Sequence, residues 1–418
     1  MRHNSNKILF QINTVGNSGS HGQIAEAIGN LAMEHGWISY IAYARRPRAS
    51  KSKLIKIGTK WDIGMHVFQT RLFDRHGFAS RRATKILIKR IKAIQPDIIH
   101  LHNIHGYYLN IELLFEYLSF ANIPVIWTLH DCWPITGHCS HFDFIGCDKW
   151  KTGCFECPQK NRYPKSILFD RSRKNYQQKK EFFTSIPNLT IVPVSKWLGN
   201  VVKQSFLRKK AVRVIYNGID TTLFVPLDVN KMKSKLRLEG KFIILGVASV
   251  WDDRKGLNDF VRLSQLLDSQ YQIVLVGLTQ QQIKKLPHTI IGISKIESTN
   301  QLVKYYSGAN VFLNPTLEDT FPTTNLESLA CGTPVITYKA GGSPEAIDST
   351  TGIIVEKGDI HGIVNAIKMI HSKGKSFYSS ACRERAVQFF SKEDRFEEYI
   401  DLYNELLHVE ENDAIKYK

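Results

Sequence analysis

Three acidic residues in the stretch 314–347 could bind the hydroxyl groups of a ligand. Glu318 and Asp319 follow a short apolar run that suits a buried strand, so we expect them on a loop. Glu327 would lie one turn into the next helix, where a carboxylate can hold the vicinal hydroxyls of a ribose. An acid on the loop suits the hydroxyls of a second sugar. The residues alone also allow a plain βαβ segment with surface acids, because short motifs match by chance.

The start of the predicted helix would lie beside these acids. Pro322 stands where the helix would begin, and its first turn would contain Thr323, Thr324 and Asn325. The N–H groups of a first turn lack partners within the helix, and the helix dipole is positive there. We therefore expect these three residues to bind the phosphates of a nucleotide sugar.

Histidines lie at the ends of two predicted strands in the first half of the chain. His102 ends the run 96–102, and His130 follows the run 124–129. Ligands of open α/β sheets bind at the carboxyl ends of the strands. A single histidine is usually a capping or core residue, but several at adjacent strand ends favour a functional site.

A glycine-rich turn separates the first predicted strand, 7–12, from the first predicted helix, 23–34. Gly16 and Gly19 would let the backbone approach a ligand closely. The spacing differs from a dinucleotide-binding fingerprint, so a tight turn without a ligand is an equal alternative.

Five of the seven cysteines fall in the segment 132–157, which has no obvious core of its own. Disulfides are unlikely in the cytosol. We expect a structural zinc that would fix this segment in place, with reduced buried thiols and a catalytic cysteine as alternatives. The expected ligands are Cys139, Cys147, Cys154 and Cys157, and the alternative ligands are Cys132, His138 and His141.

The elements that would position these groups alternate between strand and helix along the chain. A chain of 418 residues is too long for one ordinary core, so the sequence predicts an α/β protein with two domains. We place the first domain at 1–210, with a Cys-rich insertion at 131–160. The second domain is expected at 211–388, followed by a helical segment at 389–418.

The net charge of +18 is unevenly divided. Residues 1–210 contain 32 Lys and Arg against 13 Asp and Glu, whereas the remainder contains 24 against 25. Such a basic half is attracted to an anionic membrane surface, although a solvated surface is the plain alternative. No nucleic-acid-binding module is visible, so nucleic acid is not expected as a partner.

Two basic segments belong to this half. Residues 45–53 are expected to form a basic loop, and residues 80–94 an amphipathic helix with Ile86 on its apolar side. No uncharged apolar run is long enough to span a bilayer, and the start of the chain lacks the pattern of a signal peptide. We therefore expect a cytoplasmic protein that binds peripherally to the inner face of the cell membrane.

The stretch 314–347 resembles the donor-binding signature of retaining GT-B glycosyltransferases of the group 1 type, family 4. That signature has two acids separated by seven residues, followed by a helix. Asp319 and Glu327 have this spacing, whereas Glu318 lies one residue too far away, so either acid could be the first of the pair. Thr320-Phe321-Pro322 replaces the usual Gly-Phe-Gly. The Cys-rich segment is similar to loops in a subgroup of bacterial polysaccharide glycosyltransferases.

The resemblance implies roles for two cations. Lys255 precedes a glycine, as does the diphosphate-binding lysine of the family. The family's arginine six residues earlier is Ser249 here, and Arg254 is the candidate replacement. One or two cations and a helix start would stabilise the departing diphosphate, so no catalytic metal is expected.

Three further residues and the glycine-rich turn take roles from the resemblance. His130 matches the histidine that contacts the donor sugar, and His102 lies where the family often has a second cleft residue. Ser195 follows a strand at the family's usual serine position. The turn with Gly16 and Gly19 would lie near the donor phosphates or the acceptor.

The fold that the resemblance implies is GT-B, with two Rossmann-like domains facing across a cleft and a last helix crossing back to the first. The implied reaction is retaining transfer of a hexose from a nucleotide diphosphate sugar, with a UDP-sugar favoured. The expected acceptor is a polyprenyl-diphosphate-linked or other saccharide in capsule or exopolysaccharide synthesis. Alternatives are a GDP-sugar-dependent mannosyl- or fucosyltransferase, a nucleotide-sugar epimerase and a non-enzymatic zinc-containing scaffold.

Overall fold

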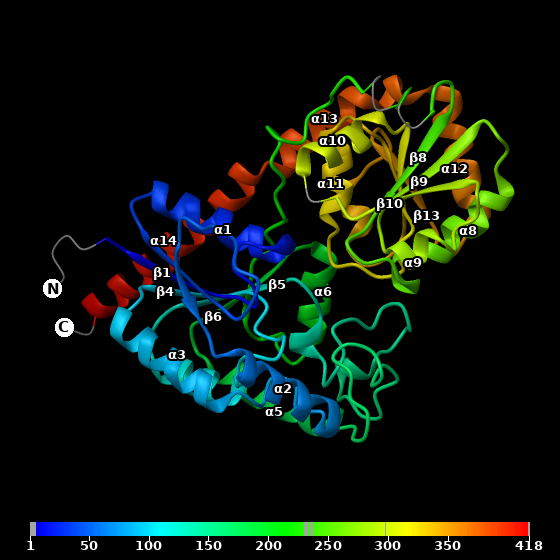
Figure 1. Ribbon diagram of the computed structural model, residues 1–418. Helices are drawn as coiled ribbons and strands as arrows, with labels where there is room; N and C mark the ends of the chain where they lie inside the picture. Colours follow the sequence, from blue (N-terminus) through cyan, green and yellow to red (C-terminus); the bar gives the residue numbers. More distant parts are fainter. Residues whose placement is uncertain (1–5, 230–232, 235–236, 297, 417–418) are drawn as a thin grey trace. The chain divides into compact units, whose positions relative to one another are not determined.

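The chain folds into two compact α/β units (Figure 1). A computed structural model describes residues 6–416, except for 230–232, 235–236 and 297. The first unit is Met1–Tyr216 with Arg395–Lys418, and the second is Asn217–Asp394. Each contains a parallel sheet with helices, so the prediction of two Rossmann-like domains is confirmed.

The sheet of the first unit has seven strands among the described residues, all parallel, in the order β3-β2-β1-β4-β5-β6-β7. Its central strands are apolar and almost wholly buried, as expected for a parallel sheet covered by helices on both faces. β1 pairs with both β2 and β4, so the strand order reverses between β1 and β4, where open sheets bind ligands. The strands are β1 (Ile8–Ile12), β2 (Ile38–Tyr43), β3 (Lys53–Lys56), β4 (Ile98–Leu101), β5 (Val125–Leu129), β6 (Leu189–Pro193) and β7 (Ala211–Val212).

Helices from both ends of the chain complete this unit. The last helix returns to it, because its aromatic residues pack into the same core as β1, β4 and β5 through Phe396, Tyr399, Ile400 and Tyr403. The helices are α1 (Gly19–Glu34), α2 (Lys60–Phe73), α3 (Arg81–Ile94), α4 (Ile111–Phe120), α5 (Ser172–Ser185), α6 (Lys196–Gln204) and α14 (Lys392–Lys416).

Three details of this unit differ from expectation. The segment read as a basic loop ends in β3, a short edge strand whose two lysines hide its pattern. The sequence does not predict α2, because the usual amphipathic pattern has its apolar residues on the buried side and α2 has them on the exposed side. Ile86 of α3 is 51% exposed, since the buried side of that helix is formed by Ala83, Thr84, Leu87 and Ile91.

The Cys-rich insertion has a core of its own, contrary to expectation. Trp133 in the 3-10 turn η1 (Trp133–Ile135) and Trp150 in η2 (Lys149–Lys151) are buried, and Phe142 stacks on Trp150 with ring centroids 4.8 Å apart. Lys179 of α5 is buried beside them and donates hydrogen bonds to the carbonyl oxygens of Trp133 and Thr136. Aromatic packing and a buried cation therefore already hold the insertion to the sheet.

The sheet of the second unit has six described strands, all parallel, in the order β10-β9-β8-β11-β12-β13. Its strand order reverses between β8 and β11, which places a second crevice at their carboxyl ends. The strands are β8 (Phe242–Val247), β9 (Tyr271–Leu278), β10 (Ile290–Ser294), β11 (Val311–Asn314), β12 (Val335–Tyr338) and β13 (Gly352–Val355).

The helices of this unit are α8 (Leu257–Leu266), α9 (Gln280–Ile283), α10 (Thr299–Gly308), α11 (Thr323–Ala330), α12 (Ile360–Lys373) and α13 (Lys375–Phe390). Two 3-10 turns, η3 (Asp253–Lys255) and η4 (Ser343–Ala346), lie near the switch point. Across the described part of the chain, no helix has the length and apolar character needed to cross a membrane.

Candidate active site

Two cations and two acids meet at the switch point of the second unit. Lys255 ends η3, and its Nζ lies 2.5 Å from Asp319 Oδ2. Arg254 Nε lies 3.9 Å from Glu318 Oε1. The structure therefore brings together four residues that the sequence predicts at the donor site, each acid beside a cation.

The two acids differ in accessibility. The side chain of Glu318 is 4% exposed, whereas that of Asp319 is 18% exposed. The carboxylate of Asp319 is thus the better placed to meet a ligand, in agreement with its spacing from Glu327. Which of them acts as the first acid stays a prediction.

Two glycines let the backbone close around this group. Gly256 has a φ of +74°, and a Cβ there would lie 2.3 Å from the carbonyl oxygen of Pro315. Gly341 has a φ of +56°, and its Cβ would lie 1.9 Å from the carbonyl oxygen of Asp319. Only glycine fits both the angle and the contact. The acid loop is therefore clamped between η3 and the turn before η4.

Glu327 has a partner that sequence reasoning missed. The hydroxyl of Tyr306 in α10 donates to Glu327 Oε2 at 2.7 Å, and Thr323 Oγ1 lies 3.4 Å from Oε1. Burial raises the pKa of Glu327, and these two hydrogen bonds act in the opposite direction. Tyr306 lies 21 residues earlier in an ordinary-looking helix, so no motif could have marked it.

The three residues of the first turn of α11 have two different environments. Thr323 and Thr324 are partly exposed, as a phosphate site requires. Asn325 is fully buried, donates to the backbone and side-chain oxygens of Ser343 and accepts from Asn314 Nδ2 at 2.8 Å. The side chain of Asn325 therefore holds the helix start between β11 and η4, and its burial does not fit the expected contact with a diphosphate.

In the first unit, the predicted histidines form a hydrogen-bonded chain. His102 Nε2 lies 2.9 Å from Gln11 Oε1, and His102 Nδ1 lies 3.2 Å from His130 Nε2. The amide oxygen of Gln11 can only accept, so His102 carries its hydrogen on Nε2 and accepts at Nδ1. His130 must then donate from Nε2. The hydrogen bond from His102 to Gln11 of β1 thus fixes the tautomer of His130.

Both rings are neutral at neutral pH. Burial lowers the pKa of His102 well below its ordinary value, and the neighbouring His100 and His21 act in the same direction. Burial likewise lowers the pKa of His130, helped by His102 and His21. A neutral His130 can exchange hydrogen bonds with a sugar hydroxyl, but it is not a cation for a phosphate.

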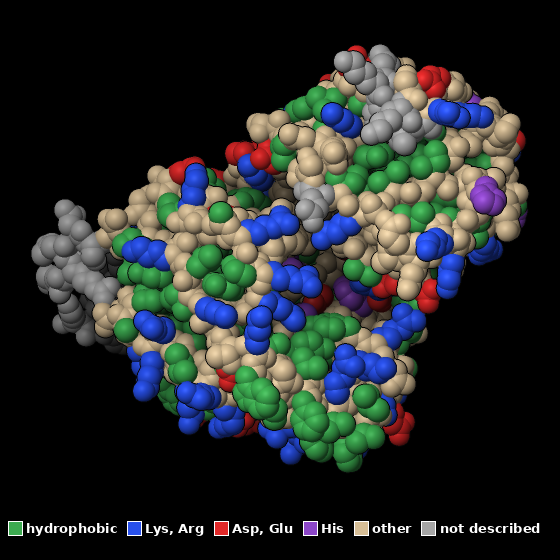
Figure 2. Space-filling model, viewed as in Figure 1, with side chains coloured by type: hydrophobic (Ala, Val, Ile, Leu, Met, Phe, Trp, Pro, Cys, Tyr) green, Lys and Arg blue, Asp and Glu red, His purple; other side chains and the backbone are tan. Residues whose placement is uncertain are grey.

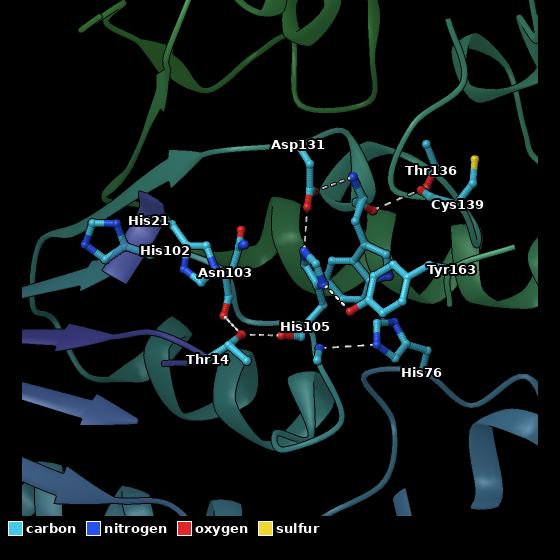
Figure 3. A network of polar contacts seen from close by, with 12 residues as sticks. Thr14, His21, His76, His102, Asn103, His105, Asp131, Thr136, Cys139 and Tyr163 are labelled. Atoms are coloured by element: carbon cyan, nitrogen blue, oxygen red, sulfur yellow. Dashed lines mark hydrogen bonds and ion pairs between the residues drawn. The ribbon is translucent and has the colours of Figure 1, made fainter. Parts of the chain in front are cut away.

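A second pair lies beside this chain, as Figure 3 shows. His105 Nε2 is 2.7 Å from Asp131 Oδ2, and His105 Nδ1 is 3.0 Å from the hydroxyl of Tyr163. Burial alone would raise the pKa of Asp131, but the charge and hydrogen bond of His105 hold it well below the usual range. Asp131 directly follows His130, which was the one sequence signal for this pair. Tyr163 follows the insertion in the chain, and no sequence pattern indicated that it would contact His105.

The glycine-rich turn lies close to these histidines. Gly19 begins α1 with a φ of +64°, and the ring of His21 lies 6.0 Å from that of His130. A Cβ on Gly16 would come within 3.3 Å of the ring of Tyr43, so the turn is packed against β2. The structure therefore brings the turn and the strand-end histidines to one edge of the sheet.

Ser195 also lies at this edge, directly beyond β6. It is fully buried, and its Oγ accepts a hydrogen bond from the N–H of Leu198 at 3.1 Å. Its side chain therefore caps α6, and the contact with substrate that the resemblance implies stays a prediction.

The four predicted zinc ligands surround one small cavity together with His138. The thiol of Cys139 hydrogen-bonds to Cys157, which lowers the pKa of Cys157 to about 7. Among the described residues, no three His, Cys, Asp or Glu side chains have the arrangement of a metal site. His138 is instead paired with Asp74 at 2.6 Å, with both side chains fully buried. The residues suit zinc by type and line one cavity, but their side chains do not form a ligand set, and zinc binding stays a prediction.

Comparison with known families covers both units. Residues 39–223 match the family described as Glycosyltransferase Family 4, and residues 241–373 match the family described as Glycosyl transferases group 1. The chain belongs to these glycosyltransferases. The family assignment that the stretch 314–347 suggested is confirmed.

Two curated proteins are similar to this glycosyltransferase in sequence. The candidate colanic acid biosynthesis glycosyl transferase WcaC of Escherichia coli K12 is 24% identical over 420 residues, which cover 95% of this chain and 100% of that protein. The UDP-Gal:alpha-D-GlcNAc-diphosphoundecaprenol alpha-1,3-galactosyltransferase of Escherichia coli is 23% identical over 222 residues. That match covers 49% of this chain and 57% of that protein.

Among solved structures, the glycosyltransferase is similar to Anabaena Alr3699/HepE in complex with UDP. The TM-score is 0.68 at 14% identity, over 96% of this chain and 100% of that one. At this identity the likeness shows the fold alone, which is GT-B. Within this fold, one of the two candidate edges described above contains partly exposed charge pairs, and the other contains neutral histidines.

Proposed function

We propose that this glycosyltransferase moves a hexose from a UDP-sugar, with retention, to a saccharide linked to a polyprenyl diphosphate. The observation that carries the proposal is the pair Lys255–Asp319 beside Glu327 and the start of α11. An arriving diphosphate offers Lys255 a stronger partner, and Asp319 can then turn to the sugar hydroxyls. Glu327 would hold the ribose.

The proposed reaction needs no enzymic base. The bond between the anomeric carbon and the β-phosphate oxygen breaks, with an oxocarbenium-like transition state. The acceptor hydroxyl attacks from the same face, and its proton passes to the departing phosphate. Lys255, Arg254 and the N–H groups at the start of α11 stabilise the charge that develops on the diphosphate. His130 and His102 are the candidates for contacts with the sugar and the acceptor.

Three findings support the choice of substrates. The similar Anabaena structure holds UDP, and one relative is named for UDP-galactose and a diphosphoundecaprenol acceptor. Another relative is assigned to colanic acid, which supports a role in bacterial surface polysaccharide synthesis. A lipid-linked acceptor would place the enzyme peripherally on the inner face of the cell membrane, where the excess of basic residues in 1–210 favours anionic lipids. The family assignment favours glycosyl transfer over an epimerase or a scaffold.

The test is a transfer assay with UDP-, GDP- and ADP-sugars and a polyprenyl-diphosphate-linked saccharide, followed by NMR of the product. We expect transfer from a UDP-sugar with the anomeric configuration retained, and no turnover of the donor without acceptor. Glu327→Ala should abolish transfer. Inverted product or a preference for GDP-sugars would contradict the proposal, as would near-normal turnover by Glu327→Ala.

A further inference from the structure

Helix α2 of the first unit buries polar side chains and exposes apolar ones. Its two buried residues, His66 and Thr70, are polar. The ring of His66 hydrogen-bonds to Ser80 Oγ and accepts a hydrogen bond from the N–H of Gly77. Its large apolar residues face outward instead: Trp61 is 77% exposed, and Met65 and Phe68 are exposed on the same side. A helix of a soluble protein normally shows the reverse pattern. The outward stripe therefore needs a partner.

A loop from the far side of the insertion extends this stripe. Ile167 donates its N–H to the carbonyl oxygen of Arg71 at 2.7 Å, which ties the loop to the end of α2. Phe169 stacks on Phe73 with ring centroids 5.9 Å apart. We call the whole surface the apolar patch, and its exposed members are Trp61, Met65, Phe68, Phe73, Ile167, Leu168 and Phe169.

The segments that carry the apolar patch are rich in basic residues. The segments 60–75 and 160–174 contain nine Lys and Arg against three Asp. Two of these aspartates serve the fold: Asp74 pairs with buried His138, and Asp62 forms the capping box of α2. Figure 2 shows green side chains gathered over α2 and the insertion, with blue side chains beside them.

We propose that the apolar patch inserts into the interface of an anionic lipid bilayer. Aromatic and aliphatic side chains on one side of a helix, with cations around them, suit the boundary between head groups and acyl chains. The cations add attraction to anionic head groups. This inference deepens the proposed lipid-linked acceptor, yet it uses none of the donor-site residues. It also moves the membrane contact from α3, where the sequence suggested it, to α2, because α3 exposes charge with only Ile86 among its large apolar residues.

The test compares vesicle binding of matched variants of the full chain. Phe68→Ser with Leu168→Ser removes two members of the apolar patch. Phe120→Ser is the control, because Phe120 is 84% exposed at the end of α4. With vesicles of phosphatidylglycerol and phosphatidylethanolamine at low salt, we expect the wild type to sediment with lipid. The double variant should partition at least about tenfold less, while the control matches the wild type.

Three further measurements decide the outcome. Binding should weaken on neutral phosphatidylcholine vesicles and between about 0.05 M and about 0.5 M salt, because screening removes the attraction of the cations. Brominated lipid should quench tryptophan fluorescence in the wild type and much less in Trp61→Phe. The double variant should still transfer sugar to a water-soluble acceptor at the wild-type rate, so a failed membrane claim is distinguishable from a failed function.

The inference is overturned if the wild type does not bind anionic vesicles at low salt, or if the double variant binds these vesicles as well as the wild type does. An equal loss in Phe120→Ser would also overturn it. So would a lipid-free wild-type dimer that the double variant converts to a monomer, since the apolar patch would then contact a second copy of the chain.

Discussion

The two candidate ligand-binding edges of this glycosyltransferase differ in the chemistry of their side chains. In the second unit, Lys255 and Asp319 form a charge pair that remains partly exposed. In the first unit, His102 and His130 are neutral rings joined by hydrogen bonds. The pair His105–Asp131 beside them is almost buried, and the pair Asp74–His138 is fully buried. A partly exposed pair can exchange partners with a ligand, whereas a buried one can only hold the fold together.

This difference suggests a division of labour between the units. In the proposed function, the second unit would bind the nucleotide with charges that a diphosphate can redistribute. The first unit orients neutral groups by a hydrogen-bonded chain that is complete before any substrate arrives. Substitutions of the charged residues in the second unit should therefore weaken nucleotide binding or the stabilisation of the departing diphosphate. Substitutions in the first unit should change turnover or stability and leave nucleotide binding nearly unchanged.

The largest effect is expected from the buried pair. His138→Ala leaves Asp74 without its charged partner in a site that water does not reach, so the free energy of unfolding should fall by about 3–5 kcal/mol. Urea unfolding measures this value, with the exposed His361→Ala as control. A change below about 1 kcal/mol would mean that the pair does not hold the insertion in place.

The exposed pair should act on turnover. Lys255→Ala removes a cation from the departing diphosphate, so kcat should fall by about 10²–10³-fold while the unfolding temperature changes little. Lys339→Ala is the matched control, because Lys339 lies in an exposed salt bridge of the same unit. Steady-state kinetics with a UDP-sugar would reveal the difference, and equal activity of both variants would remove Lys255 from the site.

A third comparison concerns His130. His130→Ala should lower kcat by roughly 10–100-fold, through the loss of a hydrogen bond and the unsatisfied groups left behind. The KM for the nucleotide sugar should stay within about twofold, because the ring is neutral and contributes no charge to the diphosphate. An increase in KM without a decrease in kcat would assign His130 to ground-state binding instead.

A smaller effect is expected at Tyr306. Its hydroxyl opposes the rise that burial causes in the pKa of Glu327, so Tyr306→Phe should raise that pKa further. Glu327 would then gain its proton at a higher pH, and the acidic limb of the kcat/KM profile should move to higher pH. A pH profile of wild type and variant checks this. An unchanged acidic limb would mean that Glu327 does not set it.

The smallest effect is expected from metal removal. If Cys139, Cys147, Cys154 and Cys157 hold zinc, elemental analysis should find one zinc per chain, and Cys154→Ser with Cys157→Ser should lose it. The insertion already has an aromatic core, so the unfolding temperature should fall by only a few degrees. Cys382→Ser serves as control, since Cys382 is buried in the second unit. Protein without zinc after purification in zinc-containing medium would contradict the prediction.

The contrast also explains what the sequence could predict. The two loop acids, Glu327, the start of α11 and Gly341 of the candidate donor site are close together in sequence, so their spacing predicted both the chemistry and the family. The partners that hold them are not local: Tyr306 and Gln11 meet Glu327 and His102 only through the fold. Asn325 looked like a ligand because its position in α11 was right, but its orientation into the core depends on η4. The exposed apolar stripe on α2 could not be predicted, because the helical spacing of apolar residues does not tell which side of the helix faces water.

The central claim is that nucleotide recognition resides in the charged residues of the second unit. Calorimetric titration of UDP into the wild type, Glu327→Ala and His130→Ala tests it most directly. We expect the dissociation constant to rise at least about tenfold in Glu327→Ala and to stay within about twofold in His130→Ala. Equal affinity of Glu327→Ala and the wild type, or a loss of UDP binding in His130→Ala alone, would contradict the claim.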